Sequence, residues 1–315
     1  MGRIALFAAS SQTGRAAVST LLGWEGRAPY MHGVRAVFRS EEKAGAMAKE
    51  ATLRSSNKTR PPEAELSFAS GFDAYDPPSK LAEAFSDSDV AILVTPHDPS
   101  RGFADDAMLQ KNMMDAAVSG GVKHIVSVGS WTVRDAEHVP LLAARFAAPE
   151  EHLDTLGVGW TSIRAGFFNP NLANLFGSLR TSDEIRFPAE CAFAPCDPRD
   201  VGRVAATVAA DVASKRGDHS GATYDVSGPE LFTVADMAEV FAQALERPNI
   251  CLAPTNVEEH AGTMPSPALE ELLLHMGRKG ASAVPFAPGA VKELTGEDAV
   301  SLYEWIKANK DLFKR

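Results

Sequence analysis

The segment from Ile4 to Leu22 constrains the fold of this chain more than any other segment. It begins with an uncharged apolar run from Ile4 to Ala9, passes through small polar residues and Gly14, and ends in residues 16–22, whose apolar positions follow a helical period. This order predicts a strand, a tight turn and a helix. At the start of an α/β chain such a unit usually holds the pyrophosphate of a dinucleotide, because the helix N-terminus offers unpaired N–H groups and a positive dipole end.

The turn keeps one of the three glycines of a dinucleotide-binding turn of the form G-x-x-G-x-x-G. Ala8, Ser11 and Gly14 stand in the three glycine places. Glycine serves there because it adopts positive φ and lets a ligand approach the backbone closely. Alanine and serine are the next smallest residues, so they crowd a pyrophosphate without plainly excluding it. Two interpretations stay open, a phosphate-binding turn and an ordinary strand-turn-helix unit without a ligand.

Alternating strand and helix patterns continue along the chain. Further strands are predicted at residues 33–38, 65–69, 90–94, 123–128 and 160–164, and helices are predicted from residue 41, up to residue 119 and over residues 141–156. The wholly apolar run from Val90 to Val94 is typical of a central parallel strand that is covered on both faces. Strands joined by helical crossovers predict a doubly wound parallel sheet of the Rossmann type.

Candidate ligand contacts follow three of these strands at their carboxyl ends. Arg39 follows the second strand, where arginine pairs with the 2′-phosphate of NADP(H) and an acidic residue would accept from the 2′-hydroxyl of NAD(H). Asp73 follows the third strand within reach of an adenine amino group, and Thr95 and Pro96 follow the fourth. The sequence therefore favours NADP(H), and the alternative for Arg39 is a solvated side chain.

The pattern changes after residue 165. We expect a dinucleotide-binding domain over residues 1–165 and a smaller α/β portion over residues 166–315, interwoven with the sheet and without a clean linker. This second portion is expected to bind the substrate as a lid over the carboxyl edge. Within it, Asp197 and Pro198 predict a helix start, and Thr233 with Asp236 has the spacing of a capping box.

Charge and composition limit the partners. The formal net charge of −10 disfavours nucleic acid, whose phosphates are bound by clustered lysine and arginine. No apolar run reaches the length of a membrane span, and the N-terminal run is too short for a signal peptide. The three cysteines have no zinc spacing, so we expect buried thiols and no metal site. A cytoplasmic location is the default expectation.

Several segments, in their order and spacing, resemble the NmrA-like family of atypical short-chain dehydrogenases/reductases over nearly the whole chain. The resemblance rests on ASSQTGRAAV, VRAVFRSEEKA, FDAYDPPSKL, VAILVTP, KNMMDAAVSGGVKHIVSVGS, GWTSIRAGFFNPNL, DPRDVGRVAA, YDVSGPELFTVADMAEV and LTGEDAVSLYEWIKAN. It implies a Rossmann domain that binds NADP(H) and a small C-terminal portion that binds a substrate.

The resemblance also implies roles for single residues. The implied phosphate loop consists of Ala8, Ser10, Ser11, Gln12, Thr13 and Gly14. Arg39 is the implied 2′-phosphate contact, Asp73 the adenine neighbour, and Thr95 with Pro96 the wall beside the nicotinamide ribose. The implied substrate pocket is lined by Phe167, Phe168 and Asn169, and Trp131, which follows the fifth strand, is a further candidate for its lining.

The catalytic pair of the classical short-chain dehydrogenases is missing. Those enzymes carry Tyr-x-x-x-Lys on the helix before the sixth strand, and the matching positions here are Leu142 and Phe146, with Arg145 one place out of register. Ser130, at the end of the fifth strand, is the remaining candidate catalytic residue. His97 and His138, in nearby loops, are further candidates for donating a hydrogen bond.

Two classes of function are consistent with these residues. One is NADPH-dependent reduction of a polarised small molecule such as an iminium, quinone or enone, which needs less help from a proton donor than a ketone does. The other is a non-catalytic sensor whose NADP(H) occupancy changes its binding to a protein partner. We favour the reductase, because Phe167 and Phe168 suggest an apolar small-molecule pocket. A Rossmann-like remnant that binds nothing is a third interpretation.

Overall fold

A seven-stranded sheet forms the centre of the fold in the computed structural model, which describes residues 2–23, 33–56, 65–95, 103–264 and 266–314. Its strand order is β3-β2-β1-β4-β5-β6-β9. The strands are β1 (Arg3–Phe7), β2 (Gly33–Val37), β3 (Leu66–Ala69), β4 (Val90–Val94), β5 (His124–Ser130), β6 (Gly159–Ala165) and β9 (Ala222–Val226). The neighbours from β3 through β5 pair in parallel. The predicted doubly wound α/β fold is therefore confirmed, with its switch point between β1 and β4.

The packing of the backbone divides the chain into two compact units. The first unit comprises residues 1–129, 145–163 and 199–224, and the second comprises residues 130–144, 164–198 and 225–315. Each unit is thus assembled from three separate segments. The domain boundary at residue 165 stays a prediction, because this division describes packing and not independent folding.

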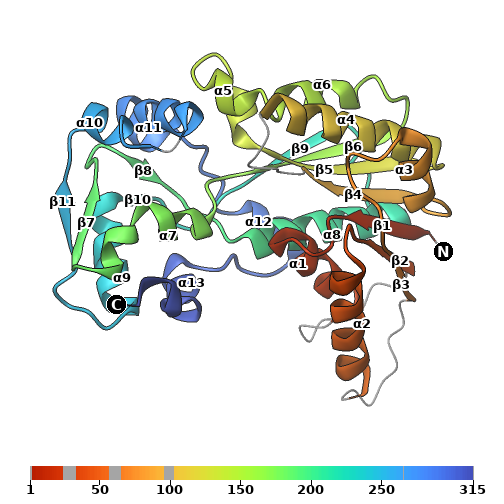
Figure 1. Ribbon diagram of the computed structural model, residues 1–315, viewed down its shortest axis with the longest axis horizontal. Coiled ribbons are helices and arrows are strands. Elements are labelled where there is room, and N and C mark those ends of the chain that lie inside the picture. The colour runs from red at the N-terminus through yellow and green to blue at the C-terminus, as the bar shows by residue number, and fades with distance from the viewer. Residues whose placement is uncertain (1, 24–32, 57–64, 96–102, 265, 315) are drawn as a thin grey trace. The chain divides into compact units, whose positions relative to one another are not determined.

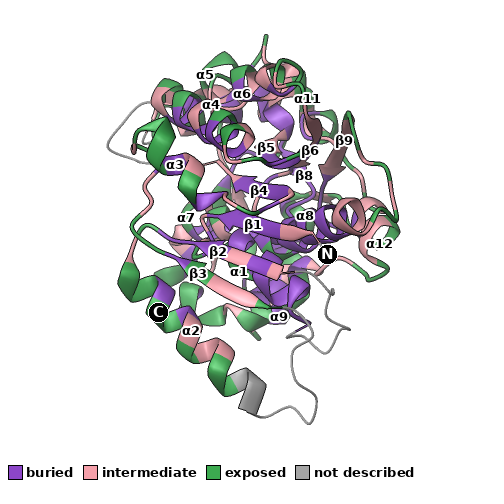
Figure 2. Ribbon diagram, turned by 90° about the vertical axis from the view of Figure 1, so that its right-hand side faces the viewer, coloured by how far each residue is buried: buried purple, intermediate pink, exposed green. Residues whose placement is uncertain are grey.

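Helices cover the sheet of the first unit on both faces. Figure 1 shows α3 (Pro78–Ala84), α4 (Phe103–Ser119) and α6 (Ala147–Leu153) on one face, and α1 (Gln12–Leu21) and α8 (Pro198–Ser214) on the other. α2 (Glu41–Ser56) follows β2. The strands β1 and β4 are mostly buried between these layers (Figure 2). This double cover explains why β4 consists only of apolar residues.

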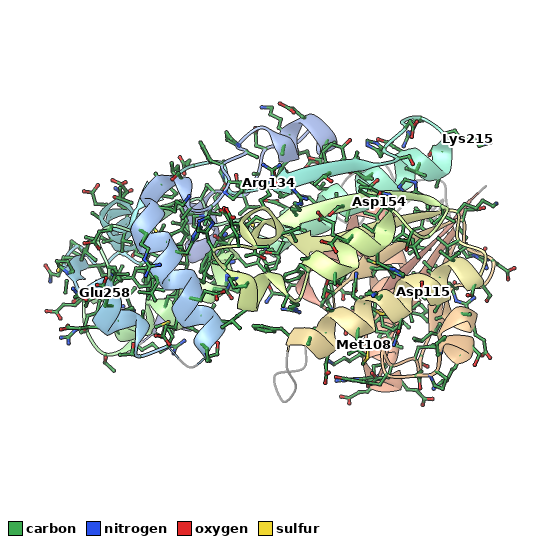
Figure 3. The ribbon with its side chains drawn as sticks, turned by 90° about the horizontal axis from the view of Figure 1, so that it is seen from above. Met108, Asp115, Arg134, Asp154, Lys215 and Glu258 are labelled. Atoms are coloured by element: carbon green, nitrogen blue, oxygen red, sulfur yellow. The ribbon has the colours of Figure 1, made fainter. Side chains whose placement is uncertain are left out.

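The two faces of α4 differ as expected for a helix that covers a sheet. Asp106, Gln110 and Met113 are buried on its inner side. Met108 is 49% exposed, and Figure 3 shows it and Asp115 projecting from the helix. Asp115 Oδ1 lies 2.7 Å from Nε2 of His152 on α6, so an ion pair links the two neighbouring helices when His152 is protonated.

The single helix predicted over residues 141–156 is wrong, because two helices occupy this stretch. They are α5 (Pro140–Ala143) and α6, separated by residues 144–146. Pro149 explains the break, since it lacks the N–H that would bond to the carbonyl of Arg145 in a continuous helix. In the first turn of α6 that N–H is not required.

The second unit combines short strands and helices around an apolar core. Its strands are β7 (Glu184–Phe187), β8 (Ala192–Phe193), β10 (Phe232–Thr233) and β11 (Cys251–Pro254). Its helices besides α5 are α7 (Leu172–Leu175), α9 (Val234–Ala244), α10 (Val257–Ala261), α11 (Pro267–Lys279), α12 (Ala290–Thr295) and α13 (Leu302–Ala308). Phe241 packs edge-on against Phe176 and Phe313, with ring centroids 5.5 and 5.0 Å apart. The capping box predicted at Thr233 and Asp236 is confirmed at the start of α9.

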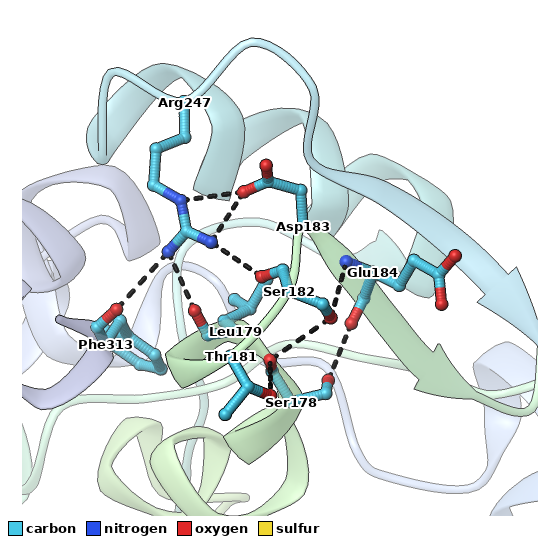
Figure 4. Close-up of polar contacts among 8 residues, drawn as sticks. All are labelled: Ser178, Leu179, Thr181, Ser182, Asp183, Glu184, Arg247 and Phe313. Carbon is cyan, nitrogen blue, oxygen red and sulfur yellow. Dashed lines mark hydrogen bonds and ion pairs between the residues drawn. The ribbon is translucent and has the colours of Figure 1, made fainter. Parts of the chain in front are cut away.

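One arginine ties three backbone segments of the second unit together. Figure 4 shows Arg247 bonded to Asp183 and to three carbonyl oxygens. Its Nε and Nη2 donate to Asp183 Oδ1 at 2.9 and 2.6 Å. The carbonyl oxygens of Ser182, Leu179 and Phe313 accept from its Nη atoms at 2.6, 2.9 and 3.3 Å, respectively. Arg247 therefore joins the loop before β7 and the C-terminal segment to the end of α9.

A buried histidine at the start of β5 should make stability depend on pH. Burial, with the nearby charge of His219, lowers the pKa of His124 from 6.5 to about 4. The unfolded chain therefore takes up this proton first as the pH falls. The resulting stability is fully present above about pH 6.5 and is lost toward pH 4, by about 2 kcal/mol at pH 5. Urea denaturation at pH 7 and pH 5 measures this loss, and His124→Asn should reduce it; an equal loss in the variant would contradict the assignment.

The structure corrects the expectation for one of the three cysteines. Cys191 and Cys196 are buried, whereas Cys251 is exposed on β11, which corrects the expectation of three buried thiols. Burial raises the pKa of Cys191 to about 12, so its thiol is protonated at neutral pH. No helix in the described ranges is long and apolar enough to cross a membrane. Among the same residues, no group of three or more metal-binding side chains comes together.

Candidate functional site

The turn after β1 has the backbone that the sequence led us to expect. Ala8 has a φ of +64°, in the left-handed region that favours glycine. The amide of Ser11 donates to the carbonyl of Ala8 at 2.9 Å, and Ser11 Oγ caps α1 by accepting from the amide of Gly14 at 2.9 Å. Ser10 and Gln12 are exposed, while Thr13 is buried. The turn therefore places small polar groups at the positive end of the α1 dipole.

Two glycines allow close backbone packing beneath this turn. A Cβ on Gly14 would lie 2.3 Å from the carbonyl oxygen of Ala8. A Cβ on Gly202, in α8, would lie 2.3 Å from the carbonyl oxygen of Thr13 and 2.8 Å from Cβ of Ala16. Gly202 was not among the residues predicted from the sequence. A single glycine within a helical pattern was the available signal, because such glycines often mark close packing.

Ala8 offers a direct test of strain at the turn. We expect Ala8→Gly to raise the free energy of unfolding by about 1 kcal/mol, because a left-handed conformation costs alanine roughly that amount more than glycine. Urea denaturation measures the effect. Ala9→Gly, one residue along in a buried position with no positive φ, is the matched control and should lower stability. Equal losses in both variants would contradict strain at Ala8.

The structure brings Arg39 and Asp73 together. Arg39 Nε lies 3.7 Å from Asp73 Oδ2, and the Arg39 side chain is 73% exposed. Asp73 is held by its neighbours, since its Oδ1 accepts from the amide of Tyr75 at 3.2 Å and its own amide donates to Asp76 Oδ2 at 2.7 Å. That bond, followed by the contact with Lys80, lowers the pKa of Asp76 against the opposing effect of burial. Asp76 does not cap α3, because Pro77 holds the cap position.

At the end of β4, Thr95 contacts the next strand and a buried ion pair. Thr95 Oγ1 donates to the carbonyl of Val128 at 2.9 Å, and the carbonyl of Thr95 accepts from Arg145 Nη2 at 3.4 Å. Arg145 Nε lies 3.0 Å from Oδ2 of Asp106, whose side chain is 1% exposed. Burial lowers the pKa of Arg145, and the charge of Asp106 opposes that effect. Pro96 and His97 lie outside the described residues.

Ser130, the candidate catalytic residue, belongs to the second unit. Its Oγ caps the short 3₁₀ helix η1 (Trp131–Asp135) by accepting from the amide of Thr132 at 3.4 Å, and it also accepts from Thr132 Oγ1 at 3.2 Å. Ser130 is half-buried. Ser130 accepts in both of these hydrogen bonds, and its hydroxyl can donate one hydrogen bond to another group.

The predicted pocket residues also lie in the second unit. Trp131 is buried and stacks on His275, with ring centroids 6.2 Å apart, and Phe167 packs against Phe193 at 4.7 Å. Phe168 is half-buried. Asn169 is fully buried, and neither its Oδ1 nor its Nδ2 has a hydrogen-bond partner among the described residues. These side chains give the second unit apolar surfaces and one buried amide, and their role as a pocket stays a prediction.

A group of titratable side chains, of which the sequence indicated only His138, includes the histidine that stacks on Trp131. His275 Nε2 lies 3.4 Å from Asp135 Oδ2, and His138 Nδ1 lies 3.7 Å from Asp135 Oδ1. The two histidine rings are 5.6 Å apart. His138 was a candidate donor from its sequence position, whereas His275, on α11, had no local signal that tied it to Asp135.

Comparison with known proteins places the chain in a family. The model of the NmrA-like family matches residues 1–305. A (4-alkanoyl-5-oxo-2,5-dihydrofuran-3-yl)methyl phosphate reductase of Streptomyces griseus subsp. griseus is 28% identical over 246 residues, which cover 76% of this chain and 82% of that protein. An NAD(P)H azoreductase of Xenophilus azovorans is 29% identical over 244 residues, covering 75% and 80%.

A solved structure shows the same fold. The triphenylmethane reductase of Citrobacter sp., complexed with NADP(H), superposes with a TM-score of 0.73 at 20% identity, covering 97% of this chain and 99% of that chain. The family model covers almost the whole chain, and the chain therefore belongs to the NmrA-like family.

Proposed function

We propose that this protein binds NADP(H) and reduces a polarised small molecule of the iminium, quinone or enone type. The observation that carries the proposal is the turn from Ala8 to Gly14, whose left-handed residue and capped helix start lie beside the switch point of the sheet. Both curated relatives are reductases, and one is an NAD(P)H azoreductase, which supports the same class of reaction.

The residues of the turn fit the chemistry of a dinucleotide. The N-terminus of α1 carries no acidic residue in its first turn, so its dipole favours an anionic pyrophosphate. The exposed Arg39 offers the bidentate donors that a 2′-phosphate requires. Bound there, the cofactor would supply a hydride, which is the chemistry that the chain itself lacks.

The proposed roles of this chain's residues are binding, orientation and proton donation. Ser11 and the amides at the start of α1 would hold the pyrophosphate, and Thr95 would border the nicotinamide ribose. Ser130 would donate a hydrogen bond to the substrate. A polarised acceptor suits a site without the tyrosine and lysine pair, because general acid catalysis contributes less when the acceptor already carries positive charge or electron-withdrawing groups.

Calorimetric titration with NADPH and NADH tests the cofactor assignment. We expect binding of both cofactors with a clear preference for NADPH. Arg39→Asp should remove that preference, because it exchanges an attraction for the 2′-phosphate for a repulsion, with an expected change in the affinity ratio of about a hundredfold. Arg15→Gln is a control near the same turn, since Arg15 pairs with Glu50 at 2.6 Å, and it should leave the preference for NADPH unchanged. An unchanged preference for NADPH over NADH in Arg39→Asp would overturn the assignment of Arg39 as the 2′-phosphate contact.

Turnover separates the reductase from a sensor. NADPH consumption should be measured with a panel of quinones, imines and enones. Steady consumption with any class supports the reductase. Tight binding of NADPH without turnover of the whole panel would favour the sensor instead, and no binding of either cofactor would exclude both functions.

A further inference from the structure

The buried ion pair Asp106–Arg145 lies beside Thr95, on the side of the sheet edge where the nicotinamide end of a bound dinucleotide would lie. Ligands of doubly wound sheets cross the carboxyl edge at the switch point, here between β1 and β4. Arg39, at the end of β2, lies on one side of that point. Thr95, at the end of β4, lies on the other side, and its carbonyl accepts from Arg145. If Arg39 binds the adenosine end, the nicotinamide end belongs on the side of Thr95.

Contacts from several elements fix the guanidinium of Arg145. Asp106, in the first turn of α4, faces its Nε at 3.0 Å. The rings of Phe146 and Phe103 lie 5.0 and 6.0 Å from its Cζ. The planar guanidinium of arginine suits this arrangement, since one edge can face a carboxylate while another edge donates to a carbonyl. Because Thr95 also donates to Val128, the Thr95 peptide is held from two directions.

The pair adds no net charge to this part of the first unit. An arginine keeps its proton even when burial lowers its pKa, so Arg145 needs a nearby anion, and Asp106 supplies it. This balance matters for a nicotinamide, whose oxidised form is a cation and whose reduced form is neutral. An unbalanced guanidinium would repel the oxidised ring and leave the reduced ring unaffected.

We propose that Arg145, with Asp106, is a positioning element that fixes the Thr95 peptide at the nicotinamide end of the site and keeps that end electrically balanced for both oxidation states. This inference rests on the proposed function, because it requires a bound NADP(H). Arg145 acts through Thr95 and does not replace the missing lysine as a proton-transferring group, since guanidinium does not give up its proton.

Ligand dissection in the full-length protein tests the first part of the inference. Calorimetry should compare NADPH with 2′,5′-ADP, which lacks the nicotinamide half, for the wild type, Arg145→Lys and Arg145→Ala. We expect both variants to lose affinity for NADPH by about tenfold and to bind 2′,5′-ADP within about twofold of the wild type. Arg145→Lys keeps the ion pair and so keeps the test valid if Arg145→Ala fails to fold.

The oxidation state of the cofactor tests the second part. Asp106→Asn removes the negative charge that faces Arg145 Nε, and we expect it to weaken NADP⁺ binding relative to NADPH by about fivefold. A purely structural pair would not change this ratio. Arg216→Ala is the control, because Arg216 also forms an ion pair within the first unit, with Asp211 at 3.2 Å, but its side chain is exposed. It should change neither affinity nor ratio.

The outcomes separate the inference from the function on which it rests. Equal loss of NADPH and 2′,5′-ADP, or an unchanged NADP⁺ to NADPH ratio in Asp106→Asn, would overturn the inference and leave the proposed function standing. A wild-type protein that binds none of these ligands would overturn both.

Discussion

Gly202→Ala should destabilise the protein by about 2 to 3 kcal/mol, although alanine is the better helix former. The new Cβ would lie 2.3 Å from the carbonyl oxygen of Thr13 and 3.0 Å from the amide nitrogen of Ala17. Both are backbone atoms of α1, so a side-chain rotation cannot relieve the clash. α8 and α1 must therefore separate. The free energy of unfolding from urea denaturation measures the cost.

The same substitution should weaken NADPH binding, because it displaces the start of α1, where the pyrophosphate is proposed to bind. Gly45→Ala is the matched control, since Gly45 lies within α2 and a Cβ there would meet no atom within 4 Å. Gly45→Ala should stabilise the protein by about 0.5 to 1 kcal/mol and leave binding unchanged. If Gly202→Ala and Gly45→Ala both stabilised the protein, or both destabilised it, the result would contradict close packing of α8 on α1.

Arg247→Ala should cost about 3 kcal/mol of stability, which makes it the largest expected effect in the second unit. The substitution removes the hydrogen bonds that Arg247 donates to the Asp183 carboxylate and to the carbonyls of Leu179 and Ser182 (Figure 4). These groups are partly buried, so water replaces the lost hydrogen bonds incompletely. Urea denaturation, followed by far-UV circular dichroism, measures the loss.

Arg186→Ala is the control for Arg247. Arg186 also forms an ion pair, with Glu184 at 2.8 Å, but its side chain is 66% exposed. Exposed pairs contribute little, so we expect a change below about 0.5 kcal/mol. A similar loss in both variants would show that Arg247 acts as an ordinary surface charge, and Arg247→Lys should recover only a small part of the loss, because lysine cannot serve several acceptors in one plane.

Local patterns were sufficient for most of the sheet. The run from Val90 to Val94 forms β4 with the predicted bounds, and the first strand, turn and helix appear in the predicted order. The capping box at Thr233 was also readable, because its two residues lie within one helical turn. Where the prediction failed, at the helix expected over 141–156, the signal of Pro149 was present but was outweighed by the apolar periodicity of its neighbours.

The candidate site was predictable only in part. Ala8, Ser11 and Gly14 stand three residues apart within one short segment, so their spacing was enough to suggest a phosphate loop. Arg39 and Asp73 were found one by one from the ends of their strands, but their ion pair was not. Pro96, also part of the predicted site, lies outside the described residues.

The sequence by itself determined the alternation of strands and helices and the start of α1, because these depend on residues a few positions apart. Only the tertiary structure decided that Gly202 must lack a side chain, that Asp106 meets Arg145, and that Arg247 holds three segments together. Each of these three contacts joins residues that are distant in the chain. Their meeting depends on how whole elements pack, and no local pattern of residues records that packing.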